Sequence, residues 1–191
     1  VLNIFDKLSH AVYDKRSSVA RAGCQAVSSM AQRMKGDLSE ELLDILLPSL
    51  FRAVIVSVGV ISDSGDACIS EIIQNCFGGS SLEDEGPKVH LARVFAEEII
   101  SSKVSKIAKL KAKCALYLSQ CFEVGLVGSS HLPKPVADIA SVAIEKALND
   151  ADATVRGNAK LAYETFHRVV DESYFNAFTQ KFGPEIKKRL A

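Results

Sequence analysis

The chain has 191 residues, and its 23 Lys plus Arg and 23 Asp plus Glu give a formal net charge of +0 at pH 7. This balance argues against a protein whose whole surface is built for nucleic acid or for an anionic membrane. Hydrophobic residues make up 48% of the chain, but aromatic residues only 7%, and tryptophan is absent. This composition favours a helical core of Ala, Leu, Ile and Val over a β-sandwich.

The chain contains 5 cysteines, none of which belongs to a Cys-x-x-Cys motif. Each one falls within an apolar helical pattern. We therefore predict reduced, buried thiols in a cytosolic protein, rather than a zinc site or a disulfide framework. No metal and no cofactor are expected. The N-terminal stretch "VLNIFDKLSHAVYD" has no basic segment followed by an apolar one, so we expect no secretory signal.

Residues 42–62, "LLDILLPSLFRAVIVSVGVIS", are apolar enough to suggest a membrane span. Asp44, Pro48 and Arg52 interrupt this stretch. A charge near the centre of a span costs about 2.5–3.5 kcal/mol on insertion scales, which disfavours insertion. We predict instead a helix buried between two neighbours, with a bend or a packed irregularity at Pro48. No membrane association is expected.

Apolar residues at helical spacing recur along the whole chain, and no stretch alternates as a strand does. The third predicted helix has Ser39 as its N-cap, and a final helix includes "YFNAFTQKF" and "PEIKKRL". In chain order, the eight predicted helices before this final one span residues 1–13, 18–34, 40–55, 66–77, 87–102, 107–124, 136–149 and 155–170.

These helices form pairs. The polar, Gly-rich stretch "GGSSLEDEG" (78–86) is interpreted as a loop between repeats. The turns inside the pairs fall near Asp14, Ser62, Lys103 and Asp150, which are roughly 40 to 50 residues apart, the period of HEAT and armadillo repeats. The predicted fold class is therefore all-α, a HEAT-repeat α-solenoid of about four helix pairs plus a C-terminal helix.

Two of these turns have similar sequences, "DKRSSVARAG" near the N-terminus and "NDADATVRGN" near the C-terminus. In each, an Asp is followed five residues later by a Val. We expect the short side-chain oxygens to cap the N–H groups that begin the second helix of a pair, and the Val to be core. The small residues Gly23 and Ala159 would allow close helix approach. The basic residues around these positions are not required by the fold.

All turns of this kind lie on one edge of a repeat array, because every pair follows the same path. A ridge of Lys and Arg without a pocket suits an acidic protein surface or a phosphate backbone. Nucleic acid is the less favoured partner, because no aromatic residues for base stacking lie among these cations. The candidate binding residues are Lys15, Arg16, Lys103, Lys106, Lys109, Arg156 and Lys160.

The residues also resemble a known family. The segment "NDADATVRGNAKLAYETFHRVVDESYFNAFTQKFGPEIKKRL" is similar to the last repeat and closing helix of a TOG domain of the CLASP type. The stretch "DKRSSVARAGCQAVSSMA" resembles the second repeat of that family. "SDSGDACISEIIQN" resembles the third repeat, and "SSKVSKIAKLKAKCALYLSQCF" the one after it.

This resemblance implies a flat paddle of HEAT repeats whose intra-pair turns bind the αβ-tubulin heterodimer or the microtubule lattice. Such proteins regulate microtubule dynamics in the cytoplasm, at plus ends, spindles or kinetochores. By position, Lys15 and Arg16 match the second-repeat turn of the family. Lys103 and Lys106 match the fourth-repeat turn, while Arg156 and Lys160 match the last. We expect the isolated domain to be monomeric.

The chain departs from the family pattern at two places. TOG domains usually begin with a repeat upstream of the Asp14 turn, often with a tubulin-contacting aromatic residue. The chain before Asp14 is too short for another pair, so we expect a single domain, 1–191, that lacks the first repeat. In addition, Val58 and Gly59 stand where a basic residue is common. Both departures argue against tight binding of free tubulin. Binding to the lattice, or to another partner, stays open.

The sequence contains no phosphate-binding P-loop, no Gly-x-Ser-x-Gly elbow and no His-Glu-x-x-His motif. His131 follows Ser129 and Ser130, but no acid that would orient it as a catalytic base is evident. We therefore do not expect an enzyme. Two other functions stay open at this point: a HEAT adaptor that holds a peptide or a helix on its concave side, and a HEAT-type nucleic-acid binder.

Overall fold

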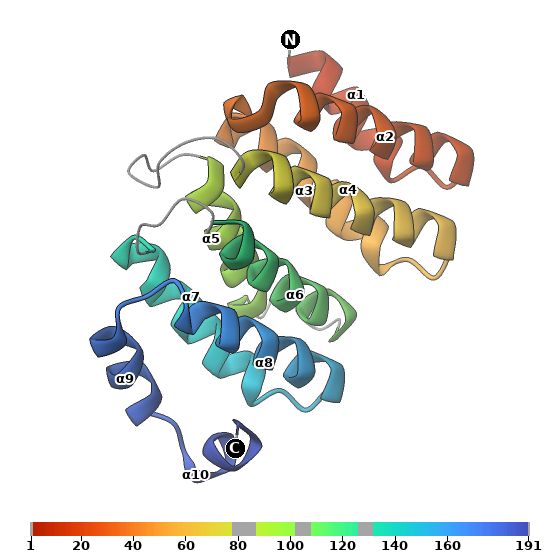
Figure 1. Ribbon diagram of the computed structural model, residues 1–191. Helices are drawn as coiled ribbons and strands as arrows, with labels where there is room; N and C mark the ends of the chain where they lie inside the picture. Colours follow the sequence, from red (N-terminus) through yellow and green to blue (C-terminus); the bar gives the residue numbers. More distant parts are fainter. Residues whose placement is uncertain (1, 78–86, 102–107, 126–131, 191) are drawn as a thin grey trace. The chain divides into compact units, whose positions relative to one another are not determined.

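The structure is a computed structural model, and it describes residues 2–77, 87–101, 108–125 and 132–190 (Figure 1). Every regular element within these ranges is helical, which confirms the predicted all-α class. The chain divides into two compact units, an N-terminal unit that includes the described residues up to 77 and a C-terminal unit that includes those from 89 on. The prediction of a single domain over 1–191 remains a prediction.

The N-terminal unit contains four α-helices and one short 3-10 helix. In chain order these are α1 (Leu2–Val12), α2 (Ser17–Met34), η1 (Lys35–Asp37), α3 (Glu40–Ile55) and α4 (Gly59–Phe77). The C-terminal unit contains α5 (Pro87–Ile100), α6 (Ala108–Gly125), α7 (Lys134–Leu148), α8 (Ala153–His167), α9 (Glu172–Gln180) and α10 (Pro184–Leu190).

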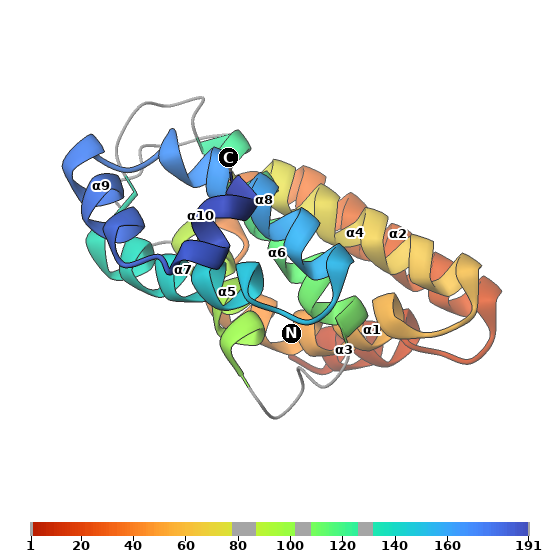
Figure 2. The same cartoon turned by 90° about the horizontal axis from the view of Figure 1, so that it is seen from below.

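In the N-terminal unit, α1 pairs with α2 and α3 pairs with α4. The two pairs stack so that α1 packs against α3 and α2 packs against α4 (Figures 1 and 2). The apolar residues of α3 recur at helical spacing on one face, and Leu43, Leu46 and Leu50 are completely buried. The first helices of the two pairs therefore pack on each other, and so do the second helices. This is the arrangement predicted for a HEAT array.

The stretch of residues 42–62 is therefore not a single long helix. It comprises most of α3, the turn after it and the start of α4. Helix α3 continues through Pro48, which is exposed, so the backbone hydrogen bond that proline removes is lost on the outer side of the helix. Among the residues that the structure describes, no helix combines the length and the apolarity needed to span a membrane.

The fourth helix begins earlier than the sequence predicted. We expected it at Asp66 after a turn near Ser62, but α4 begins at Gly59, and the turn consists of residues 56–58. Ser62 lies inside the helix, is buried, and donates a hydrogen bond of 2.7 Å from its hydroxyl to the Val54 carbonyl oxygen. The Gly and Ser residues that suggested a turn thus serve the packing of α4 on α3.

Two glycines in second helices allow close approach to the preceding helix. A Cβ atom at Gly23 would lie 2.9 Å from the backbone of Ala11 and Val12 in α1. A Cβ atom at Gly65 would lie 3.1 Å from Ala53 Cβ in α3. The expectation that Gly23 permits a close contact between helices is confirmed. Any larger residue there would push α2 away from α1.

In the C-terminal unit, α8 packs against both α6 and α7. Aromatic rings join its helices: Phe95 of α5 lies 5.3 Å from Tyr117 of α6, and Phe122 of α6 lies 5.5 Å from Phe166 of α8, between ring centroids. Such tilted ring pairs stabilise a core beyond the area they bury. Aromatic residues are few in this chain, and here they concentrate in the core of one unit.

The chain closes with two helices where the sequence predicted one. Helix α9 ends at Gln180 and α10 begins at Pro184, because proline is favoured at the first position of a helix and cannot sit in its interior without breaking a hydrogen bond. Phe182 lies between the two helices and is buried, 4.6 Å from Phe178 and 5.9 Å from Tyr163 between ring centroids. The break therefore turns an aromatic side chain into the core.

Two glycines offer a matched test of the packing. Substitution Gly23→Ala is expected to destabilise the chain by about 1–3 kcal/mol, because the methyl group would overlap the α1 backbone. Substitution Gly157→Ala in α8 is expected to stabilise it by about 0.5–1 kcal/mol, because an added Cβ there meets nothing within 4 Å and alanine favours the helix. Urea denaturation followed by helical circular dichroism measures both. Equal effects of the two substitutions would contradict the close approach at Gly23.

Candidate interaction edge at the turns

The turn between α1 and α2 is closed by the Asp14 carboxylate. Its Oδ1 accepts a hydrogen bond of 2.8 Å from the Arg16 backbone N–H, and its two oxygens each lie 3.0 Å from the Arg16 guanidinium. The side-chain and backbone hydrogen bonds from Arg16 lower the pKa of Asp14 to about 2. Arg16 is thus exposed, but its charge is already paired in the turn.

The turn between α7 and α8 repeats this geometry. Oδ1 of Asp150 accepts a hydrogen bond of 2.9 Å from the Asp152 backbone N–H, as Asp14 does from Arg16. Asp152 then caps α8, accepting from the N–H groups of Thr154 at 2.8 Å and Val155 at 3.1 Å. The predicted side-chain cap is confirmed for α8, whereas the N-cap of α2 is Arg16, which makes no side-chain capping bond. The two turns share the hydrogen bond to the first Asp, which gives their similar sequences a structural cause.

Arg156 belongs to the same turn. Its Nη1 donates hydrogen bonds to the carbonyl oxygens of Asp150 at 2.9 Å and Ala151 at 2.7 Å, and the side chain is half-buried. These carbonyls lie between two helices and have no helical partner of their own, so the guanidinium satisfies them. Arg156 therefore has a structural role in the loop, whatever it contacts outside the chain.

Two further contacts fasten this turn to α6. Lys111 Nζ lies 2.9 Å from Asp150 Oδ2, and the two side chains are only 20% and 15% exposed. Asn158 Nδ2 donates a hydrogen bond of 2.8 Å to the Ala112 carbonyl oxygen. Burial raises the pKa of Asp150, but the hydrogen bonds from Lys111 and from the backbone outweigh it, so the net pKa is lowered. The start of α6 and the α7–α8 turn thus form one rigid surface.

The structure places the predicted binding residues as follows. Lys15 and Arg16 lie on the α1–α2 turn of the N-terminal unit, whereas Lys109 at the start of α6, Arg156 and Lys160 lie in the C-terminal unit. Lys15 and Lys160 are exposed, and neither has a side-chain partner among the described residues. Lys103 and Lys106 lie outside the described residues.

Exposed apolar side chains on the turns of the N-terminal unit were missed by the sequence reasoning. Val58 is 49% exposed and Val60 is 47% exposed at the α3–α4 turn, and Tyr13 is 43% exposed before the α1–α2 turn. The α1–α2 and α3–α4 turns lie at the same end of the unit, because the two pairs stack in parallel (Figure 1). The sequence does indicate that Tyr13 is exposed, because at helical spacing it does not lie on the face formed by Phe5, Leu8 and Val12.

The Asp14–Arg16 pair predicts a measurable titration. Substitution Arg16→Ala should raise the pKa of Asp14 from about 2 toward its ordinary value of about 3.9. The rise should be incomplete, because the residue 16 backbone N–H still donates. NMR titration of the Asp14 carboxyl carbon measures it. The Lys15→Ala variant is the control and should leave the value near 2. An unchanged pKa in Arg16→Ala would mean that the guanidinium does not bind the carboxylate in solution.

The sign of the linked stability change follows from the direction of this shift. The folded-state pKa lies below the unfolded value, so the carboxylate favours the folded state above the unfolded pKa. This contribution is lost as the pH falls from about 4 through 2.

Arg156 and Lys160 differ in their predicted effect on folding. Substitution Arg156→Met should destabilise the chain by about 1–3 kcal/mol, because two turn carbonyls lose their donor. Substitution Lys160→Met should change the stability by less than about 0.5 kcal/mol, because that exposed side chain touches no partner in the described part of the chain. Thermal unfolding of the two variants measures the difference, and equal midpoints would contradict the clamping role of Arg156.

Comparison with known proteins gives three matches. The sequence model of the family described as CLASP N terminal matches residues 2–191. A protein of Arabidopsis thaliana named CLIP-associated protein is 26% identical over 188 residues, which are 96% of this chain and 12% of that protein. The chain therefore spans only 12% of the length of this relative.

A solved structure described as the structural basis of microtubule plus end tracking by XMAP215, CLIP-170 and EB1 has the same fold. It matches with a TM-score of 0.71 over 98% of this chain and 71% of that chain, at 15% sequence identity. A likeness at this identity concerns the fold alone, and it confirms the predicted HEAT-like class.

Proposed function

Because the chain belongs to the CLASP N-terminal family, we propose that it is a non-enzymatic domain that binds αβ-tubulin or the microtubule lattice. In the full protein this binding would serve the regulation of microtubule dynamics and place the protein on the cytoskeleton. The observation that carries the proposal is the match of the family over residues 2–191, together with turns that present unpaired lysines. A relative named CLIP-associated protein and a structural neighbour from microtubule plus end tracking support it.

The proposed contacts are the turns at the start of each second helix. Lys15 and Lys160 offer ammonium groups to an acidic partner without first breaking a bond inside the chain. Arg16 and Arg156 each hold their own turn in shape, and each presents its remaining donors at that turn. Lys109 at the start of α6, together with Lys103 and Lys106, which precede it in the sequence and lie outside the described residues, completes the proposed set.

Apolar side chains at the turns of the N-terminal unit add a second kind of contact. Tyr13, Val58 and Val60 expose apolar surface beside the cations Lys15 and Arg16. Exposed ion pairs each contribute only about 0–1 kcal/mol, so cations alone would mainly orient the partner. Burial of these three side chains would supply affinity that salt does not screen. Apolar contacts beside the cations are consistent with a chain that has Val58 and Gly59 where the family commonly has a basic residue.

A charge-reversal variant tests the proposal. The double substitution Lys15→Glu and Lys160→Glu is expected to weaken co-sedimentation with microtubules, or co-elution with soluble tubulin, by about tenfold, which is roughly 1.4 kcal/mol. The salt dependence of binding should become flatter, because two charges that face the partner are removed. The stability of the chain should stay unchanged, because both side chains are exposed and neither forms a hydrogen bond or an ion pair with a described residue.

The matched control is Lys35→Glu with Lys181→Glu, which has the same net charge. Lys35 follows the far end of α2, roughly 27 Å from the α1–α2 turn by helix length. The charge of Lys181 helps to lower the pKa of Asp138, so Lys181 lies near the first turns of α7 and away from the α7–α8 turn. The control should bind as the unmodified chain does. Equal loss in both variants would leave only a net-charge effect, and no loss in either would favour an adaptor that binds elsewhere.

A further inference from the structure

Two adjacent serines follow two adjacent cations at the α1–α2 turn. Lys15 and Arg16 are exposed, and the next two residues, Ser17 and Ser18, begin α2. Ser17 is half-buried, whereas Ser18 is exposed, and the Ser18 hydroxyl has no hydrogen-bond partner among the described residues. The second serine therefore offers a free hydroxyl group, with Arg16 two positions and Lys15 three positions before it.

This order of residues is the one that basophilic serine kinases select. In such kinases, carboxylates beside the active site bind an Arg or Lys that stands shortly before the serine of the substrate. Apart from Ser17, no other serine or threonine in the described ranges has two cations within the three positions before it. The exposed hydroxyl of Ser18 is therefore distinguished from the other hydroxyl groups of the chain.

The turn can present Ser18 to a kinase at little cost. The chain is not helical at Lys15, and it is extended at Arg16, with φ −82° and ψ 111°. The first turn of a helix opens readily, because its leading N–H groups have no helical partner. Arg16 is bound to Asp14, but 74% of its side chain is exposed, so a kinase carboxylate can replace the Asp14 carboxylate.

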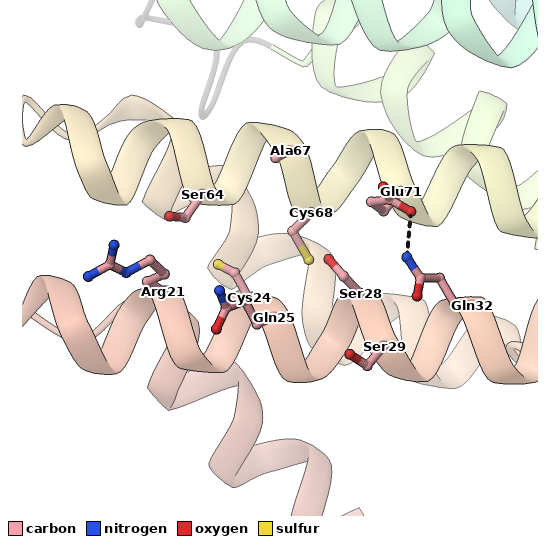
Figure 3. Close-up of a pocket in the computed structure, with 10 residues that line it drawn as sticks. All are labelled: Arg21, Cys24, Gln25, Ser28, Ser29, Gln32, Ser64, Ala67, Cys68 and Glu71. Atoms are coloured by element: carbon pink, nitrogen blue, oxygen red, sulfur yellow. Dashed lines mark hydrogen bonds between the residues drawn. The ribbon is translucent and has the colours of Figure 1, made fainter.

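A further cation, Arg21, lies one helical turn after Ser18 and is exposed. Figure 3 shows Arg21 at one end of a polar groove of about 550 Å³ between α2 and α4. The acidic residue of this groove, Glu71, lies at the other end and accepts a hydrogen bond of 3.1 Å from Gln32. Gln32 is roughly 16 Å from Arg21 along α2, so Glu71 does not neutralise Arg21.

We propose that Ser18 is a phosphorylation site of a basophilic protein kinase, and that the phosphate cancels the positive charge of the α1–α2 turn. Phosphoserine carries a charge of about −1.5 to −2 at pH 7. Lys15 and Arg21 each supply one positive charge, and neither has a side-chain partner in the described part of the chain. The modified turn is thus close to neutral. The site itself does not rest on tubulin binding, whereas the effect on binding rests on the proposed function.

The transfer balances with ATP as the phosphoryl donor. Ser18 Oγ attacks the γ-phosphorus, so that an O–P bond forms, the bond from that phosphorus to the oxygen of the β-phosphate breaks, and ADP leaves. The hydroxyl proton passes to a carboxylate base of the kinase and then to solvent. Nothing is oxidised or reduced.

The phosphate is compatible with the folded chain. Because the Ser18 side chain is exposed, the phosphate stays in water and displaces no core residue. Negative charge among the first residues of a helix is also favourable. A loss of binding in the modified chain would therefore report the change of charge and not unfolding of α2.

The first experiment tests the site. The 191-residue chain is incubated with ATP and the catalytic subunit of cAMP-dependent protein kinase, and the phosphate is located by mass spectrometry of its peptides. We expect one phosphate per chain, on Ser18. Ser18→Ala should abolish the incorporation and Arg16→Ala should slow it at least tenfold, whereas the control Arg33→Ala, at the far end of α2, should leave the rate unchanged. No incorporation, a phosphate on another residue, or an unchanged rate in Arg16→Ala would overturn the proposed site.

The second experiment tests the effect on binding. The phosphorylated chain should co-sediment with microtubules about tenfold more weakly than the unmodified chain, and phosphatase treatment should restore the binding. Its thermal unfolding midpoint should not fall. Equal binding of the two forms would overturn the proposed effect of the charge. If the unmodified chain itself does not bind, the proposed function fails and this effect fails with it, whereas the mapped phosphate still decides the site.

Discussion

Each helix pair of this chain leaves one apolar face that only a neighbouring pair can cover, and the structure depends on this stacking. In the N-terminal unit α2 lies on α4, and in the C-terminal unit α6 lies on α8. Small side chains such as Ala20 and Ala159 are completely buried in these helices, and within the first pair Gly23 allows the backbones of α2 and α1 to approach closely. Because small residues bring helices close, a slight change in the stacking displaces everything attached to the helix ends.

The turns are attached to those ends, and their polar residues are used in two ways. Asp14 and Asp150 close their turns through the same hydrogen bond to the residue two positions on. Arg16 and Arg156 are bound within the loops, so the fold itself requires their donors. Lys15 and Lys160, by contrast, are exposed and have no side-chain partner in the described part of the chain, because an ammonium group on a long stem has no fixed geometry to satisfy in a tight turn. A chain of zero net charge can thus present positive charge at chosen places.

The sequence allowed the helix pairs, the Asp cap of α8 and the close approach at Gly23 to be predicted, because each depends on local spacing. The start of α4 could not be predicted, since Gly59 and Gly65 suggest a turn unless the packing of Gly65 on α3 is known. The hydrogen bonds that Arg156 donates within its own turn could not be predicted either, because the acceptors are backbone carbonyls, which every residue possesses. Whether an arginine faces a partner or its own loop is decided by three-dimensional distances, and spacing alone does not give them.

The cysteines illustrate the same limit more sharply. In the sequence all five sit in apolar helical patterns and are equivalent, and the structure does bury all five. The structure distinguishes them: Cys114 is completely buried, whereas Cys24 of α2 and Cys68 of α4 both line a polar groove between these two helices.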